Sequence, residues 1–165
     1  VFQHSTLFDS MTCAENVALP LRKHKGLKPK EAASEARRLL TQVHMAEFGD
    51  RYPAELGDGM RKRVAIARAL SLEPRYVLFD EPTTSLDPVS ARRVDKLIRE
   101  LSDTLGVTSI VVSHDLVSIF TIADRIVMLY KGEVKLLGTR DEFKSSPDGI
   151  IQQFINGRAE GPMEA

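Results

Sequence analysis

Three short and nearly continuous apolar segments in the second half of the chain limit its possible folds most strongly. They are residues 76–80, 109–113 and 125–130. Strands buried on both faces have this composition, because helices cover a parallel sheet on either side. A helical stretch from Pro88 to Leu105, closed by Gly106, separates the first two segments, and this order predicts a βαβ unit. The chain is therefore expected to contain part of an α/β core.

The first half of the chain, residues 5–72, predicts helices and no strand. Pro29 opens a helix to about Val43, since proline is tolerated in a first turn and the apolar residues after it recur at intervals of three and four. A second helix is predicted over residues 59–70. Its charged run Arg61-Lys62-Arg63 is interpreted as a solvated helix face.

The end of the chain predicts a hairpin and then helix. Gly132 follows the third apolar segment and turns the chain into residues 133–137, which predict the second strand of the hairpin. The sequence from about Arg140 has helical character and gives way to polar residues near Gly161-Pro162.

Composition narrows the class of protein without indicating its chemistry. The 165 residues are 42% hydrophobic, and 23 basic residues balance 23 acidic ones, which argues against a general nucleic-acid binder. The single cysteine, Cys13, excludes an internal disulfide. No run approaches the roughly 18 apolar residues of a membrane-spanning helix. These features favour a soluble, single-domain, cytoplasmic protein with no nucleic-acid partner.

Two adjacent carboxylates, Asp80 and Glu81, follow the first apolar segment and precede Pro82. Open α/β sheets bind ligands at the carboxyl ends of their strands. In a nucleotide site Asp80 would hold magnesium, and Glu81 would polarise the water that attacks the γ-phosphate. The alternative interpretation is a polar turn before the proline.

His114 directly follows the second apolar segment. Parallel neighbouring strands end at the same edge of a sheet, so Glu81 and His114 are expected to lie together there. A histidine in this place can hydrogen-bond a phosphate oxygen and position the attacking water. The alternative is a histidine that is simply hydrogen-bonded at a strand end.

Five segments in this order resemble an ABC-transporter ATPase subunit. They correspond to the Q-loop, the signature motif, the Walker B strand with its glutamate, the D-loop and the switch histidine: Gln3, Leu56-Gly57-Asp58-Gly59-Met60-Arg61, residues 77–82, Ser85-Leu86-Asp87-Pro88 and His114. The resemblance covers essentially the whole chain. It implies an α/β fold of the P-loop NTPase (RecA-like) class with a helical subdomain.

The resemblance also implies roles for individual residues. ATP and Mg²⁺ would be the cofactors, Glu81 and His114 the catalytic residues, and Asp80 and Gln3 the residues that approach the metal. Nucleotide contacts are implied for the other motif positions, namely Gln3, Leu56, Gly57, Asp58, Gly59, Ser85 and Asp87.

The same resemblance implies two protein partners. Two ATPase subunits would close as a homodimer over two ATP molecules, with Asp87 coupling the two sites. The Q-loop and the helical subdomain would contact an integral-membrane permease, which places the protein peripherally on the cytoplasmic face of the inner (plasma) membrane.

Several segments are similar to one branch of the family, the Mla/Mkl branch, whose members serve lipid or hydrophobic-solute transport. They are residues 9–12, 15–18, 59–63 and 153–157. The resemblance therefore implies transport of phospholipids or related apolar solutes.

One family motif is missing. A phosphate-binding loop needs the pattern G-x-x-x-x-G-K-[S/T], and no glycine in this chain is followed by lysine. In the family this Walker A portion precedes the Q-loop. The chain, which begins at Val1 in the phrase V-F-Q-H, is therefore expected to be N-terminally truncated and, by itself, inactive toward ATP.

The signature motif departs from the usual L-S-G-G and reads Leu56-Gly57-Asp58-Gly59. Gly57 lacks the serine hydroxyl that donates to the partner's γ-phosphate. Asp58 places a negative charge near that phosphate, at a cost of about 3 kcal/mol for ~5 Å and an effective dielectric of ~20. The alternative interpretation is that Asp58 caps the helix that follows.

The sequence divides into four expected parts. Residues 1–4 would end the Q-loop strand, residues 5–72 would form the helical subdomain with the signature, residues 73–145 would form the later half of the RecA-like core, and residues 146–165 would be a helical tail.

Two other functions stay open beside the transport ATPase. One is a degenerate or truncated, non-hydrolysing ABC subunit that only binds the permease. The other is a soluble ABC ATPase of DNA repair or translation, although the chain has neither coiled-coil insertions nor tandem cassettes. Half a core should expose apolar sheet surface, so the isolated chain is expected to be marginally stable or self-associating.

Overall fold

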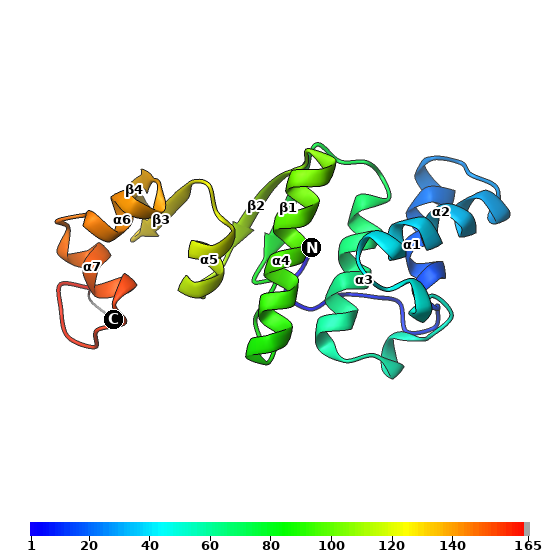
Figure 1. The fold of residues 1–165 in the computed structure, drawn as a ribbon, viewed down its shortest axis with the longest axis horizontal. Helices are drawn as coiled ribbons and strands as arrows, with labels where there is room; N and C mark the ends of the chain where they lie inside the picture. The colour runs from blue at the N-terminus through cyan, green and yellow to red at the C-terminus, as the bar shows by residue number, and fades with distance from the viewer. Residues whose placement is uncertain (164–165) are drawn as a thin grey trace. The chain divides into compact units, whose positions relative to one another are not determined.

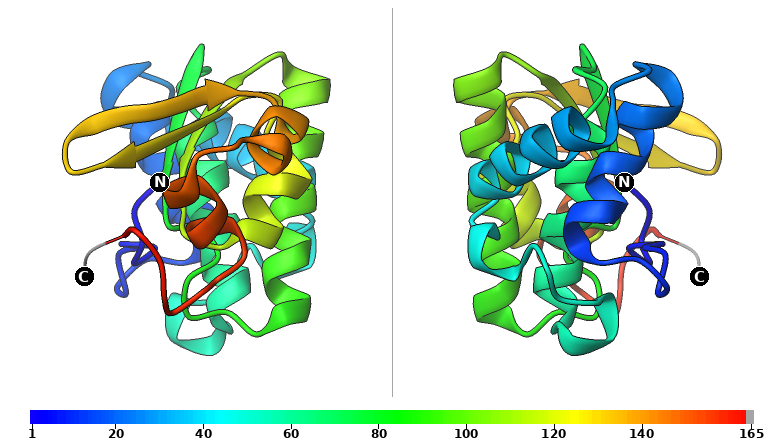
Figure 2. Two further views of the ribbon diagram at one scale, coloured as in Figure 1. Left: turned by 90° about the vertical axis from the view of Figure 1, so that its left-hand side faces the viewer. Right: turned by 90° about the vertical axis from the view of Figure 1, so that its right-hand side faces the viewer.

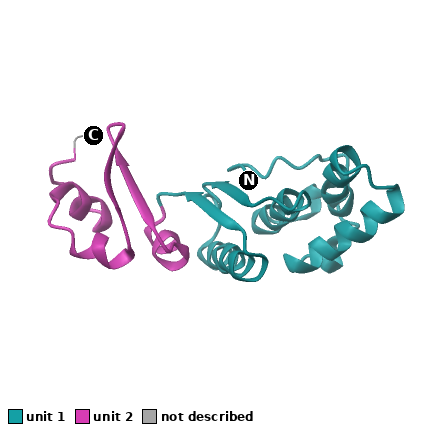
Figure 3. Cartoon of the chain, turned by 90° about the horizontal axis from the view of Figure 1, so that it is seen from above, with its two compact units in different colours: residues 1–114 teal, residues 115–165 magenta. Residues whose placement is uncertain are grey.

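The computed structural model describes residues 1–163. They fall into two compact units, residues 1–114 and the described residues from 115 onward (Figure 3). The boundary between them falls inside the region 73–145, and the four-part division expected above remains a prediction.

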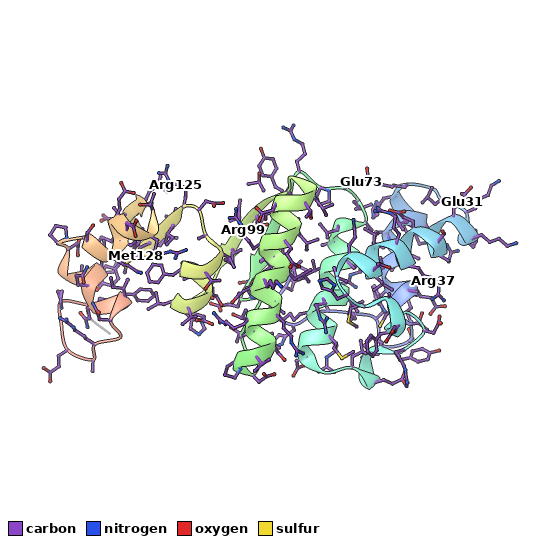
Figure 4. The ribbon with its side chains drawn as sticks, in the orientation of Figure 1. Glu31, Arg37, Glu73, Arg99, Arg125 and Met128 are labelled. Atoms are coloured by element: carbon purple, nitrogen blue, oxygen red, sulfur yellow. The ribbon has the colours of Figure 1, made fainter. Side chains whose placement is uncertain are left out.

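Every regular element between residues 5 and 72 is helical, as expected (Figure 1). These elements are α1 (Cys13–His24), α2 (Pro29–Gln42), the 3₁₀ turns η1 (Ala46–Phe48) and η2 (Pro53–Glu55), and α3 (Asp58–Leu70). α1 packs against both α2 and α3. Arg37, labelled in Figure 4, projects from α2 and pairs with Asp50 at 2.7 Å.

Helix α1 was not expected from the sequence. Thr12 and Glu15 form a capping box, in which the Thr12 hydroxyl accepts from the Glu15 N–H and the Glu15 carboxylate accepts from the Thr12 N–H. Pro20 lies inside the helix, where it lacks the N–H that would bond to the preceding turn. Packing of the buried residues Val17 and Leu21 keeps the helix continuous through the proline.

The βαβ unit is confirmed. β1 (Tyr76–Asp80) pairs in parallel with β2 (Thr108–Val112), with Leu78 opposite Ile110, and α4 (Pro88–Leu105) connects them. Gly106 ends α4 at φ +64°, a conformation that a residue without Cβ adopts at no steric cost. The hydroxyls of Ser102 on α4 and Ser109 on β2 are hydrogen-bonded at 2.9 Å, which ties the helix to the strand pair.

Residues 1–4 form no assigned strand, although Val1 lies along β1. The backbone nitrogen of Val1 donates to the Leu78 carbonyl at 2.6 Å, and the Asp80 N–H donates to the Val1 carbonyl at 2.9 Å. These two bonds place the Q-loop segment directly beside the strand that carries Asp80.

The expectation that these strands are buried on both faces is wrong for this chain. Val77 and Phe79 of β1 are buried, but the alternating residues Tyr76 and Leu78 are 58% and 63% exposed. Ile110 of β2 is 51% exposed. The helix α4 packs against one face of the pair (Figures 1 and 2), and the exposed residues of the strands alternate with the buried ones.

The second unit contains the expected hairpin. β3 (Ile126–Tyr130) and β4 (Glu133–Gly138) are antiparallel, with a register irregularity between Met128 and Leu129. Three helices accompany it: α5 (Leu116–Ile122), α6 (Arg140–Ser145) and α7 (Gly149–Ile155). Met128, labelled in Figure 4, belongs to a small core with Ile126, Phe143 and Ile151.

Candidate functional site

The carboxyl ends of β1 and β2 bring Glu81 and His114 together, which confirms their expected proximity. His114 Nδ1 lies 2.8 Å from Glu81 Oε1. The Glu81 side chain is only 18% exposed, whereas that of His114 is 73% exposed. A largely buried carboxylate thus contacts an imidazole that is open to a ligand from solvent.

Hydrogen bonds fix both the backbone and the side chain of Glu81. Its N–H donates to the Val112 carbonyl at 2.9 Å, and its carbonyl accepts from the Thr84 N–H at 3.3 Å. The Thr84 hydroxyl donates to Glu81 Oε2 at 2.8 Å, opposite the oxygen that faces His114. The backbone of Glu81 has φ +46°, a left-handed conformation that costs a residue other than glycine about 1–3 kcal/mol. Strain of this kind concentrates at functional sites.

The signature residues lie at the start of α3. Leu56 is buried, and Gly57 is the N-cap of the helix, with no side-chain cap hydrogen bond. Asp58 is the first residue inside the helix, so the interpretation of Asp58 as its cap is wrong. An acidic residue in the first turn is still favourable there, since the helix dipole is positive at that end.

The carboxylate of Asp58 forms an ion pair. Arg61, one turn further along α3, donates from Nη2 to Asp58 Oδ1, and its Nη1 donates to the Leu56 carbonyl at 2.9 Å. The cost expected for Asp58 beside a phosphate is therefore overestimated, because the guanidinium offsets much of the negative charge.

The run Arg61-Lys62-Arg63 is not a solvated helix face. Lys62 is buried, with 3% of its surface exposed, and both arginines are partly buried. The Lys62 ammonium donates to the carbonyls of Phe2 (3.3 Å), Gln3 and Glu81 (3.4 Å). Sequence reasoning missed this residue because its partners are distant in the chain.

Gln3, Asp58 and Lys62 line a cleft of about 260 Å³, together with Ser85. A second cleft, of about 360 Å³, is lined by residues that begin α3 and α4, among them Gly57, Gly59, Ser85 and Asp87. Ser85 has φ +66°, and Asp87 is the N-cap of α4. The structure thus brings Gln3, the signature residues and the D-loop residues to two adjacent clefts.

Asp87 has a structural role that the sequence did not indicate. Its Oδ1 accepts from the N–H groups of Val89 and Ser90, each at 3.0 Å. Hydrogen bonds from Ser90, side chain first and then backbone, lower the pKa of Asp87. Any role of Asp87 across a dimer remains a prediction.

Asp80 ends β1 and is exposed, while its N–H is bound to the Val1 carbonyl. Burial lowers the pKa of Lys62, and Asp80 is close enough to that lysine to offset part of the effect. Among residues 1–163 no group of three or more His, Cys, Asp or Glu side chains could hold a metal ion.

The fold and these motif positions define an ABC ATPase. Residues 1–84 match the ABC transporter family model, and the chain belongs to that family. Among solved structures it is similar to the dimeric post-hydrolysis state of the ATP-binding cassette MJ0796 bound to ADP and Pi. That comparison has a TM-score of 0.72 and 33% identity, and it covers 84% of this chain and 61% of the other.

Three curated relatives show the range of transport systems to which the chain is similar. The phospholipid transport ATP-binding protein MlaF of Escherichia coli K12 is 38% identical, over 99% of this chain and 61% of its own length. The sulfate/thiosulfate import protein CysA of Vibrio vulnificus is 42% identical, over 94% of this chain and 46% of its own. The probable ribonucleotide transport protein mkl of Mycobacterium bovis is 34% identical, over 99% and 45%. The chain thus spans about half to three fifths of these relatives.

Proposed function

We propose that the protein containing this chain is the ATP-hydrolysing subunit of an ABC transporter, and that it powers a membrane permease. The observation that carries the proposal is the Glu81–His114 contact of 2.8 Å at the carboxyl edge of β1 and β2, in a chain of the ABC transporter family. A largely buried carboxylate and an exposed imidazole in contact are suited to the hydrolysis of a phosphoanhydride by water.

Each residue has a defined part in this chemistry. Glu81 orients the attacking water and accepts its proton, while the Thr84 hydroxyl holds the second carboxylate oxygen in place. His114 hydrogen-bonds a γ-phosphate oxygen through its exposed ring, so that cleavage of the γ-phosphate from ADP changes the contact between His114 and Glu81. The products are ADP and inorganic phosphate.

Mg²⁺ fits the residues present. Magnesium in nucleotide sites is held by one or two carboxylates together with substrate phosphates, and not by an all-protein cage. Asp80 provides an exposed carboxylate at a strand end, and Gln3 provides an amide oxygen on the neighbouring segment. The ion would neutralise phosphate charge.

A second copy completes the proposed site. The N-terminal end of α3 favours an anion, and Gly57 leaves it open because no side chain caps it. We infer that this end faces the γ-phosphate held by the partner subunit, as implied by resemblance to a dimeric ATP-binding cassette.

The proposed solute is a phospholipid or a related apolar molecule. The match to MlaF covers 99% of this chain, and its printed name concerns intermembrane phospholipid transport. Within residues 1–163 no helix is both long enough and apolar enough to cross a bilayer. A separate permease on the inner (plasma) membrane would provide the path, with this subunit bound to its cytoplasmic face.

The test of hydrolysis is ATP turnover by the full-length protein, alone and with its permease. Glu81→Gln should lower turnover by about 100-fold or more, since general base catalysis contributes 10²–10⁴-fold. Asp58→Gly should raise turnover, because it removes the carboxylate beside the phosphate and releases Arg61. Absence of turnover in every form, with the permease present, would select the non-hydrolysing subunit instead.

The solute is tested separately. The transporter is reconstituted in vesicles, and ATP-dependent transfer of a fluorescent phospholipid to acceptor vesicles is measured beside uptake of labelled sulfate. Phospholipid transfer that Glu81→Gln abolishes supports the proposal. Uptake of sulfate without phospholipid transfer would contradict it and would favour the function named for the sulfate importer.

A further inference from the structure

Lys62 is a buried cation without a part in the hydrolysis proposed above. It lies one turn into α3, directly beyond the signature residues, and 3% of its surface is exposed. A buried ammonium is costly unless hydrogen bonds compensate it. Because burial of this ammonium costs free energy, we expect a role of Lys62 in the site among its hydrogen-bond partners.

The hydrogen-bond partners of Lys62 belong to two segments outside α3. Its ammonium donates to the carbonyls of Phe2 and Gln3 in the Q-loop segment, and to the carbonyl of Glu81 after β1. An ammonium has three donors, so three carbonyl partners satisfy it fully. Lys62 therefore joins the signature helix, the Q-loop segment and the loop of the catalytic carboxylate at one atom.

The charges around Lys62 point to the same location. Burial lowers the pKa of Lys62, while the carboxylates of Asp80, Asp58 and Glu81 raise it in part. All three belong to the candidate site. The ammonium is thus close enough to all three carboxylates to interact with each of them.

Lys62 contacts Glu81 at its backbone carbonyl, in the residue that has the strained, left-handed conformation. The Glu81 carbonyl accepts from Lys62 and from the Thr84 N–H, and its own N–H donates to Val112. Together these bonds hold the left-handed backbone that directs the carboxylate to His114. Without the ammonium, the peptide loses the one contact in this set that comes from α3.

We propose that Lys62 is a positioning residue for hydrolysis: it couples the signature helix to the backbone of Glu81 and so fixes the Glu81 carboxylate against His114. The proposal rests on the proposed ATPase function. It makes Lys62 the link through which a movement of α3, caused by nucleotide at the signature, reaches the general base.

The test compares three variants of the full-length protein. Lys62→Met keeps the length of the side chain and removes its donors. Lys62→Arg keeps charge and donors. The matched control is Arg68→Met on the same helix, because Arg68 donates to the Ser5 carbonyl (3.3 Å) and the Thr6 hydroxyl (3.1 Å) and so also tethers the N-terminal segment, but to residues beyond Gln3.

Steady-state kinetics provide the first readout. Lys62→Met should lower kcat at least about tenfold, because misplacement of a catalytic group is costly, while KM for ATP stays within about twofold. Lys62→Arg should recover at least about a third of the wild-type kcat. Arg68→Met should keep kcat within about twofold of wild type.

A second readout does not depend on turnover. The ¹⁵N chemical shift of His114 Nδ1, measured by NMR in the absence of nucleotide, reports its contact with Glu81. This shift should change in Lys62→Met and not in Arg68→Met. A wild-type protein without turnover would overturn the proposed function alone, since the NMR comparison still tests the link.

Several outcomes would overturn the inference. One is a wild-type kcat and an unchanged His114 signal in a folded Lys62→Met protein. Another is an equal loss of kcat in Lys62→Met and Arg68→Met, which would reduce Lys62 to a general tether. A raised KM with unchanged kcat would make Lys62 a nucleotide-binding residue instead.

Discussion

At the scale of single residues, Gly57 and Gly59 of the signature have different surroundings. A Cβ on Gly57 would meet no atom within 4 Å, whereas one on Gly59 would lie 3.2 Å from Ser90 Cβ. The backbone of Gly57 is extended, with φ −69° and ψ 161°, which any residue adopts. Position 57 therefore has room for the hydroxyl that the family usually carries there.

Gly57→Ser is predicted to raise ATP turnover of the full-length protein by about tenfold. The restored hydroxyl can donate to phosphate, and a hydrogen bond to a charged group contributes about 1.5–3 kcal/mol. The same serine can cap α3, but serine and glycine differ at an N-cap by only a few tenths of a kcal/mol. Turnover and the midpoint of thermal unfolding are measured together; a rise in the midpoint without a rise in turnover would contradict the prediction.

The residues of the candidate site were predictable to different degrees. Glu81 and His114 each end a strand, and the parallel pairing of those strands follows from the βαβ order, so their proximity could be predicted. Lys62 could not be, because its burial depends on carbonyls some sixty residues earlier and nineteen residues later in the chain. A run of three basic residues carries no sign of which one turns inward.

At the scale of secondary-structure elements, α4 depends on an ionised cap. The Ser90 hydroxyl and the N–H groups of Ser90 and Val89 lower the pKa of Asp87 in the folded chain. The stabilisation of α4 is therefore fully present above the pKa of an unfolded aspartate, near 3.9, and is lost as pH falls through the lower folded value.

Asp87→Asn is predicted to lower the thermal unfolding midpoint at pH 7 and to have progressively less effect below about pH 4, where wild type also loses the charge. Unfolding is followed by circular dichroism across this range. Asp103→Asn, near the other end of α4, is the control for a general effect of charge. An Asp87→Asn effect that stayed constant down to pH 2 would refute the assignment.

The contact between α3 and α4 sets a second element-scale prediction. Gly59 approaches Ser90 so closely that Gly59→Ala should lower the free energy of unfolding by about 1–3 kcal/mol, the usual cost of overpacking. Chemical denaturation measures this value. Gly59→Ala, Ser90→Gly and the double variant form a cycle, in which the double variant should be more stable than the sum of the two single effects predicts; strictly additive effects would disprove the contact.

Among the elements, α2, α3, α4 and the two strand pairs followed from periodicity, whereas α1 did not. Pro20 in the middle of α1 argues locally against a helix, and only the capping residues Thr12 and Glu15 signal one. Burial of Val17 and Leu21 against the neighbouring helices stabilises α1 despite the proline. The helix propensities of single residues do not include this tertiary packing.

At the scale of the whole chain, apolar surface remains open on both strand pairs. Leu78 and Ile110 are exposed on the β1–β2 pair, and Leu129 and Val134 are 68% and 62% exposed on the β3–β4 pair. The apolar runs in the sequence indicated burial, but a strand's composition does not say whether one element or two will cover it.

The polypeptide of residues 1–165 is therefore predicted to self-associate at micromolar concentration, because exposed apolar patches of this kind drive association. Leu78→Thr with Ile110→Thr should shift sedimentation profiles toward monomer without loss of helical signal. Leu105→Thr, an exposed apolar residue at the end of α4, is the control. A monodisperse wild-type monomer would contradict the prediction.

The left-handed backbone at Glu81 implies a trade-off between the proposed activity and the stability of the fold. Glycine or asparagine would fit φ +46° with less strain, so selection for stability alone would move position 81 away from glutamate. The proposed role of the carboxylate in hydrolysis gives a reason for glutamate at this position. A lineage that gave up the proposed hydrolysis would therefore be expected to lose this glutamate early.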